Sequence, residues 1–480
     1  MIDARAPGYD RLSALDASFL HLESDDTPMH VGTLATFEAA PFFDSSGRFR
    51  LAQVRDLVAS RLHLIPRFRK RLMAVPVQQG RPIWVDDLRF DIAYHVRLTA
   101  LPVPGTMAQL LALTARIEGQ LLDRTRPLWE LWFVEGLEGD RVALVQKTHH
   151  ALVDGVSGVD VATVLLDVVP EPEVSESPPW IPAGAPAPSR LLADTLLERS
   201  TESTEMMRTL RGLVRTPHRA VERSSQVGRA LRSLVDRSPI APRTSLNVAV
   251  GRRRVFLGVP ISLDTVQHIR AGLGGTVNDV VLAGVAGALR RRFLDRGEEV
   301  ADHLRVLCPV SVRDNSEHRA LGNRVSAMFV DLPIGDDDPH SRLATIRAMT
   351  HDLKDREQAV GAAFLLDLTQ YAAPTLLGLA ARLVHRQPFV NLVVTNVPGP
   401  QVPLYCMGAR MLEAYPMVPL THNLSLGIAI LSYCGVLHFG LYADGDACPD
   451  LDQLGDDLRA SFGELRQAGD LHTREQGATA

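Results

Sequence analysis

Apolar positions in the first half of the chain switch repeatedly between helical and strand spacing. Leu51, Val54 and Val58 recur every three or four residues, as apolar residues do along one face of a helix. The segment RVALVQKTHH at 141–150 instead alternates in the manner of a strand. On this basis we predict helices at 51–62, 107–121 and 156–169, and strands at 31–38, 128–136 and 141–150.

The second half repeats this mixture of patterns. Residues 276–296 have helical patterning and begin with a threonine or asparagine cap. The apolar runs at 424–432 and 436–444 are separated by residues 433–435, which is the arrangement of a β-hairpin. Further strands are predicted at 253–261, 305–312, 323–332 and 389–397. Each half is therefore predicted to be α/β, with helices packed on a sheet of several strands.

A stretch rich in proline, alanine and serine separates the two halves. Residues 171–189, EPEVSESPPWIPAGAPAPS, cannot hold a helix or an interior strand, and we interpret them as an exposed linker. Residues 190–243 then carry arginine-rich helical patterning. We predict one domain at 1–170, the linker with its helices at 171–250, and a second domain at 251–480.

Composition narrows the class of protein. With 480 residues, 46% hydrophobic and 22% charged, the chain can fill large apolar cores. The net charge of -5 gives no overall attraction to nucleic acid, which we exclude as a partner. Four widely spaced cysteines indicate neither a zinc site nor a disulfide framework. Because the N-terminus is polar and no apolar run reaches about eighteen residues, we expect a cytoplasmic chain that does not cross a bilayer.

The candidate chemistry lies in QKTHHALVDGVSG, residues 146–158, at the corner between a predicted strand and a predicted helix. Neighbouring side chains on a strand point to opposite faces, so His149 and His150 are not expected to share one role. A neutral imidazole is the natural general base for a hydroxyl nucleophile. Asp154 can orient that imidazole or hold the loop through an arginine, and Gly155 suits a sharp turn. A single histidine at a strand end is usually structural, but the full pattern H-H-x-x-x-D-G favours catalysis.

This pattern is also the motif of the CoA-dependent acyltransferase superfamily. Within that superfamily, the chain resembles the bacterial wax ester synthase/diacylglycerol O-acyltransferase family over nearly its whole length. Blocks similar to those of the family occur in the same order: LSALDASFLHLE with PMHVG in 12–32, RPLWELW at 126–132, TVNDVVLA at 276–283, PVSVR at 309–313, LGNRVS at 321–326 and TNVPGP at 395–400. The last block begins with Thr395 where serine is usual, which keeps the hydroxyl.

The resemblance implies a fold and a reaction. The fold would be two chloramphenicol-acetyltransferase-like domains, each a mixed sheet with helices, with an active-site tunnel at their interface. The reaction would move a long-chain acyl group from acyl-CoA to a lipid alcohol, giving triacylglycerol from diacylglycerol or wax ester from a fatty alcohol. His150 would act as general base while the hydroxyl oxygen attacks the thioester directly. Acyl-CoA is a substrate in this scheme, so we expect no cofactor and no metal.

The resemblance also implies roles for further residues. Asp154 would anchor its loop through an arginine, the candidates being Arg67, Arg69, Arg71 and Arg313. Asn278 would donate to an oxyanion or position the base, although Asn278 and Asp279 also suit ordinary helix capping. The catalytic-site candidates are thus His149, His150, Asp154, Gly155, Asn278 and Asp279. The substrate-binding candidates, for pantetheine or phosphate, are Arg313, Thr395, Asn396, Pro398 and Gly399.

Two alternative functions share parts of this evidence. A related acyltransferase would keep the same motif while acting on another hydroxyl or a carrier-bound acceptor. A noncatalytic lipid-surface protein would explain lipid affinity but would not require the intact motif. With insoluble substrates, we expect the protein to associate peripherally with the inner membrane or with lipid droplets. Residues 369–389 combine leucines with Arg382 and Arg386, which suits interfacial docking, although an ordinary core helix is the more common meaning of such a pattern.

Overall fold

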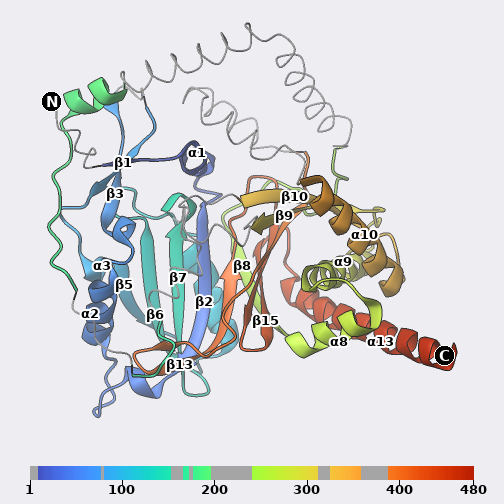
Figure 1. Cartoon of the computed structure of the whole chain (residues 1–480). Coiled ribbons are helices and arrows are strands. Elements are labelled where there is room, and N and C mark those ends of the chain that lie inside the picture. The colour runs from blue at the N-terminus through green and yellow to red at the C-terminus, as the bar shows by residue number, and fades with distance from the viewer. Residues whose placement is uncertain are drawn as a thin grey trace, which may run out of the picture.

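Two six-stranded sheets stand next to each other, and a small three-stranded sheet lies beside the first (Figure 1). The predicted α/β class is confirmed, with helices accompanying both large sheets. The computed structural model describes residues 9–76, 80–152, 166–171, 177–195, 240–311, 325–357 and 388–479. Most of the predicted helix at 156–169 and most of the arginine-rich segment at 190–243 lie outside these residues.

The first sheet has the strand order β12-β13-β2-β7-β6-β5. Its central pair is antiparallel and extends from His30 opposite His149 to Glu38 opposite Arg141. The strands that the first half contributes are β2 (His30–Glu38), β5 (Val96–Ala100), β6 (Trp129–Leu137) and β7 (Arg141–His149). The three strands predicted for this half are therefore confirmed, with their ends shifted by a residue at most places.

One helix of the first half begins at a clear local sequence signal. Thr106 and Gln109 form a capping box, in which each side chain accepts the other residue's backbone N–H, and this starts α4. The helix packs largely on β8 of the second sheet, so it lies where the two halves meet. The helices are α1 (Ala14–Leu22), α2 (Leu51–Arg61), α3 (Ile92–His95) and α4 (Met107–Glu118), with short 3-10 turns η1 (Ala40–Phe42), η2 (Pro66–Arg69) and η4 (His150–Leu152).

The second sheet has the order β10-β9-β11-β14-β15-β8 and carries its helices on the side away from the first half (Figure 1). Its strands are β8 (Arg254–Ser262), β9 (Leu304–Ser311), β10 (Val325–Leu332), β11 (Leu392–Val397), β14 (Leu426–Tyr433) and β15 (Val436–Asp444). Its helices are α8 (Leu263–Leu273), α9 (Val277–Asp295), α10 (Pro339–Glu357) and α13 (Leu451–Thr479). The predicted hairpin and the helix after the Thr276 cap are both confirmed.

Two strands from the second half of the chain complete the first sheet. Strand β13 (Ala409–Met417) pairs antiparallel with β2, and β12 (Tyr405–Cys406) extends the sheet by one further strand. Met411 and Ala414 of this excursion are buried in the core of the first half. Sequence patterning predicted one domain at 251–480. In the structure, β12 and β13 of this range belong to the first sheet, and local spacing does not encode such a long-range pairing.

The described part of the proline-rich linker, 177–189, is largely exposed, as predicted, but it is anchored to the first half. Residues 177–187 contain no helix or strand. The Trp180 ring lies 6.1 Å from that of Phe90, and the Arg69 guanidinium lies 5.1 Å from the centre of the Trp180 ring. A helix follows at 188–195, and its Leu191 packs on the small sheet formed by β1 (Asp10–Arg11), β3 (Lys70–Met73) and β4 (Ile83–Asp86).

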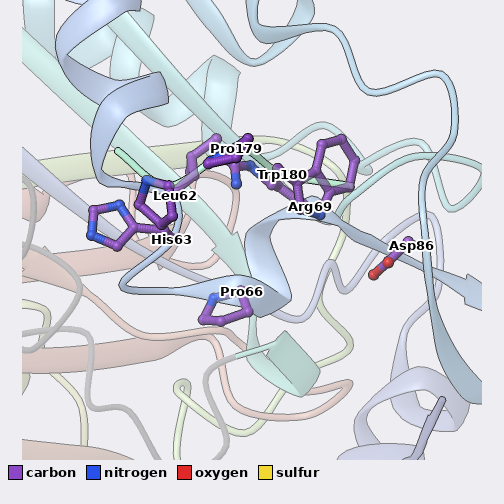
Figure 2. Close-up of a pocket in the computed structure, with 8 residues that line it drawn as sticks. Leu62, His63, Pro66, Arg69, Asp86, Pro179 and Trp180 are labelled. Carbon is purple, nitrogen blue, oxygen red and sulfur yellow. The ribbon is translucent and has the colours of Figure 1, made fainter. Parts of the chain in front are cut away.

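A pocket of about 190 Å³ lies between this linker and η2 (Figure 2). It is lined by Leu62, His63, Pro66, Arg69, Asp86, Pro178, Pro179 and Trp180. Of the predicted site residues only Arg69 lines it, and neither histidine of the motif does. This pocket is therefore distinct from the site predicted around His150.

A membrane-spanning helix needs both sufficient length and a sufficiently apolar surface. No single helix in the described part of the chain combines enough of both to cross a bilayer. Among these helices, α8 and α9 are long and apolar enough only when they are taken as one segment, and the two are bent by 98° with respect to each other.

Candidate active site

The two motif histidines lie at the end of the central strand β7. The strand ends at His149, and His150 begins the 3-10 turn η4, so strand alternation does not continue through the pair. The backbone N–H of His150 donates to the carbonyl oxygen of Met29 at 2.8 Å. This bond holds the turn against the segment that leads into β2.

His149 is fully buried and has a close neighbour at each ring nitrogen. Its Nδ1 accepts the backbone N–H of Ala151 at 3.0 Å, so this nitrogen carries no proton. Its Nε2 lies 3.3 Å from Oε1 of Glu23, whose side chain is only 3% exposed. These neighbours hold the ring in place, and the packing role expected for His149 stays a prediction.

Glu23 follows α1 and connects several parts of the site. Its Oε2 accepts two bonds from the Arg124 guanidinium, at 3.0 and 2.7 Å, and its Oε1 accepts the backbone N–H of Met29 at 3.2 Å. Burial raises the pKa of Glu23. The contact with His149, the electrostatic effect of His149 and His30, and the bonds from Arg124 outweigh burial and lower this pKa to about 2. Glu23 is therefore a carboxylate at neutral pH.

His150 has a different environment from its neighbour. Its ring stacks on that of Phe19 in α1, with ring centres 3.8 Å apart and an angle of 22° between the planes. Burial lowers the pKa of His150 to about 4, and the adjacent His149 acts in the same direction. At neutral pH the imidazole is consequently uncharged, which is the state in which it can accept a proton.

A second layer of buried polar groups lies behind the histidines. Nδ1 of His30 lies 3.3 Å from the carbonyl oxygen of Glu118, at the end of α4. Nζ of Lys147 donates to the carbonyl oxygens of Ile117 and Gln120 in the same region. Burial raises the pKa of Glu118 to about 8, although Lys147 opposes this change. These groups join the end of α4 to strands β2 and β7.

The predicted pair Asn278 and Asp279 lies in the first turn of α9. Asp279 forms a capping box with Thr276, whose backbone N–H donates to Oδ2 at 2.8 Å. Oδ1 accepts the hydroxyl of Thr350 at 2.7 Å. Both carboxylate oxygens of Asp279 are thus engaged in holding the helix start, while Asn278 beside it is half-buried.

The TNVPGP block extends from β11, which lies parallel between β9 and β14. Thr395 and Asn396 pair with Ala429 and Ile430 of β14, and Pro398 is exposed. A side chain on Gly399 would place its Cβ 2.3 Å from the carbonyl oxygen of Ser432. Close packing against β14 therefore explains the glycine independently of any ligand.

Other predicted site residues fall outside the described part of the chain. These are Asp154 and Gly155, which follow η4, and Arg313, which follows β9. The anchor of Asp154 and the tunnel consequently stay predictions. Among the described residues, no group of three or more histidine, cysteine or acidic side chains is placed to hold a metal ion.

Sequence reasoning missed Phe19, Glu23 and His30 as members of the site. All three lie in the blocks LSALDASFLHLE and PMHVG, which carried part of the family resemblance. Nothing in their spacing indicates that they meet a motif more than a hundred residues later. The antiparallel register of β2 and β7 sets His30 opposite His149, and packing of α1 against η4 brings Phe19 and Glu23 to the histidines.

The fold is shared with known proteins. A family model described as the wax ester synthase/diacylglycerol acyltransferase catalytic domain matches residues 12–281, and the corresponding C-terminal domain matches 321–466. The solved wax ester synthase/diacylglycerol acyltransferase from Marinobacter aquaeolei VT8 is 27% identical, with a TM-score of 0.69 over 96% of this chain and 100% of that one. The first condensation domain of the calcium-dependent antibiotic synthetase shares the fold at 15% identity, with a TM-score of 0.58 and 97% of each chain covered.

Curated relatives agree with these matches. The probable diacylglycerol O-acyltransferase tgs2 of Mycobacterium tuberculosis is 33% identical, over 96% of this chain and 99% of its own length. The probable diacylglycerol O-acyltransferase tgs1 of the same species is also 33% identical, over 95% and 96%. The protein is an acyltransferase of two-domain α/β architecture. It belongs to the wax ester synthase/diacylglycerol acyltransferase family, as the sequence blocks predicted.

Proposed function

We propose that this protein transfers a long-chain acyl group from acyl-CoA to the hydroxyl of a lipid alcohol, with His150 as general base. The acceptor is diacylglycerol, a long-chain alcohol, or both. The observation that carries the proposal is the environment of His150: an imidazole with a pKa near 4, stacked on Phe19 next to a histidine that is already engaged. A neutral base of this kind is what attack by a hydroxyl requires.

The reaction follows as a direct transfer. His150 takes the hydroxyl proton while the oxygen attacks the thioester carbonyl, and a tetrahedral oxyanion forms. When that intermediate collapses, the C–S bond breaks and the departing CoA thiolate takes the proton from His150. In this scheme the Asn278 amide donates to the oxyanion and Asp279 fixes the helix that carries Asn278. The backbone of 395–399 contacts the pantetheine or phosphate of CoA. No acyl group becomes attached to the protein.

An assay with two variants tests the role of His150. Purified protein is incubated with labelled palmitoyl-CoA and, in turn, with diacylglycerol or a long-chain alcohol. His150→Ala is expected to lower kcat by about a hundredfold or more, because the general base is lost, with little change in Tm. His149→Ala removes a buried partner of Glu23 and is expected mainly to lower Tm, leaving reduced activity. Equal and mild losses of kcat in both variants would exclude His150 as the base.

The same assay, repeated with a carrier-bound hydroxyl acceptor, tests the alternative function. Transfer only to a carrier-bound acceptor would show that the protein is instead a related acyltransferase with a different acceptor.

The family's substrates also bear on location. We infer that the protein meets its acceptor at the surface of the inner membrane or of a lipid droplet, without crossing a bilayer. Diacylglycerol and long-chain alcohols reside in such surfaces, and apolar side chains with arginines supply the two attractions that peripheral binding uses. The predicted docking segment, 369–389, lies almost entirely outside the described residues.

A further inference from the structure

A buried arginine of the second half reaches into the first half near the histidine site. Arg254 is the first residue of β8, and its side chain is only 2% exposed. Nη2 donates to the backbone carbonyl oxygen of Asp26, while Nη1 donates to that of Gly251 at 2.5 Å. The stem of the side chain packs at the end of α4, where a Cβ on Gly119 would lie 3.3 Å from Arg254 Cγ.

Acidic and polar groups of the second half hold this arginine in place. Oδ2 of Asp444 lies 3.7 Å from Nη1 and also accepts the backbone N–H of Gly251 at 2.7 Å. Tyr442, on the same strand as Asp444, hydrogen-bonds to Arg254. The guanidinium is therefore oriented by residues of its own half, and Asp444 balances its charge.

The carbonyl that Arg254 contacts belongs to a tight loop that carries the site. Ser24 and Thr27 exchange backbone hydrogen bonds of 3.3 and 3.1 Å, which closes the loop around Asp26. One end of the loop is Glu23, the partner of His149. The other end is Met29, whose N–H donates to Glu23 and whose carbonyl accepts the N–H of His150. Fixing the middle of the loop thus fixes both histidine contacts.

Arg252 also reaches this loop, but only at the surface. It pairs with the carboxylates of Asp25 and Asp26 at 2.8 and 3.0 Å, and its side chain is 70% exposed. Exposed ion pairs of this kind contribute little and are screened by salt. Arg254 is the buried connection between the two halves at this place.

We propose that Arg254 is a positioning residue for the transfer reaction: from across the interface it holds residues 24–29 so that Glu23 orients His149 and Met29 fixes the backbone of His150. This inference rests on the proposed role of His150 as base. Arg254 acts through the loop and contacts no substrate. It makes the geometry of the base depend on contact between the two halves, so the site is complete only when they are docked.

The test uses Arg254→Gln and Arg254→Lys in the full-length protein. Arg253→Gln is the matched control, because Arg253 is exposed and, among the described residues, its side chain donates only to Gly445 and Asp446 of its own half, at 3.1 and 3.3 Å. We expect Arg254→Gln to lower kcat by about tenfold or more while the KM for palmitoyl-CoA changes by less than about twofold, since the base is displaced and CoA contacts are not. Lysine keeps one donor, so Arg254→Lys should recover part of kcat. Arg253→Gln should match the wild type.

Hydrogen exchange provides a readout that does not depend on activity. In Arg254→Gln the backbone amides of Met29 and His150 should exchange about tenfold faster, while those in α13 keep their protection, and Arg253→Gln should leave all of them unchanged. Wild-type kcat with unchanged exchange in Arg254→Gln would overturn the proposal, as would equal effects of the Arg253 and Arg254 variants. If His150→Ala keeps its activity but exchange in Arg254→Gln rises as expected, the assignment of the base fails and the loop contact stands.

Discussion

His149 and His150 are adjacent in sequence, yet their surroundings give them different chemistry. His149 is held by Ala151 and Glu23 in the interior, whereas His150 stacks on Phe19 at the start of a turn. A buried imidazole with two partners is fixed and serves the structure. An uncharged imidazole without such a carboxylate partner among the described residues is available for proton transfer.

The pH dependence of the reaction follows from the state of His150. Its pKa is lowered from the usual 6.5 to about 4, so the base form persists as the pH falls below neutrality and is lost only through pH 4. We expect kcat/KM to stay nearly constant from about pH 8 to pH 5.5 and to fall below that range. Initial rates from about pH 8 down to about pH 4 measure the effect, and Tm at each pH separates it from unfolding. An acid limb centred near pH 6.5 would contradict the burial argument.

At the scale of elements, close contact between α9 and α13 fixes the helix that carries Asn278. A Cβ on Gly284 of α9 would lie 2.6 Å from Phe462 of α13, so glycine is required for this approach. On α13 itself, a Cβ on Gly463 would meet no other atom within 4 Å. The two glycines therefore differ in packing although both are helical.

This difference predicts opposite effects of the same substitution. Gly284→Ala should lower the free energy of unfolding by about 1–3 kcal/mol through overpacking. Gly463→Ala should raise it by up to about 1 kcal/mol, because alanine favours a helix. Denaturant unfolding measures both variants. A Gly284→Ala protein as stable as the wild type would show that α9 and α13 can separate without cost.

At the scale of the whole molecule, the two halves are joined by packing and by strands of the second half that extend the first sheet. Leu34 and Val145 of the first half share one apolar core with Phe256, Tyr415 and Tyr442 of the second. Strand β13 crosses from one half to the other and pairs with β2. These connections favour one fixed arrangement of the two halves. Arg254 can position residues 24–29 only in such a fixed arrangement.

Membrane association is a property of the whole surface and is tested by flotation. We expect the protein to float with anionic liposomes at low salt, because arginines are attracted to the lipid charge, and to be released only in part at high salt, because apolar side chains insert. Neutral liposomes should bind less. Recovery in the soluble fraction under every condition, together with transfer to dispersed acceptors, would argue against surface docking.

The sequence by itself determined the local features of this protein. Apolar spacing predicted helix α2 and strands β2 and β7, and the cap at Thr276 placed the start of α9, because these signals act between residues a few positions apart. The motif at 149–155 indicated the chemistry, and the sequence blocks along the rest of the chain indicated the family. Such features depend on neighbours in the chain.

Tertiary structure alone decided which distant residues meet. Glu23 reaches His149, Arg254 reaches Asp26, and β13 leaves its own half to pair with β2. The lowered pKa of His150 likewise depends on burial by the folded chain, including the stacked ring of Phe19. These contacts join segments tens to hundreds of residues apart, and burial and charge are set by the sum of such neighbours, which no local pattern specifies.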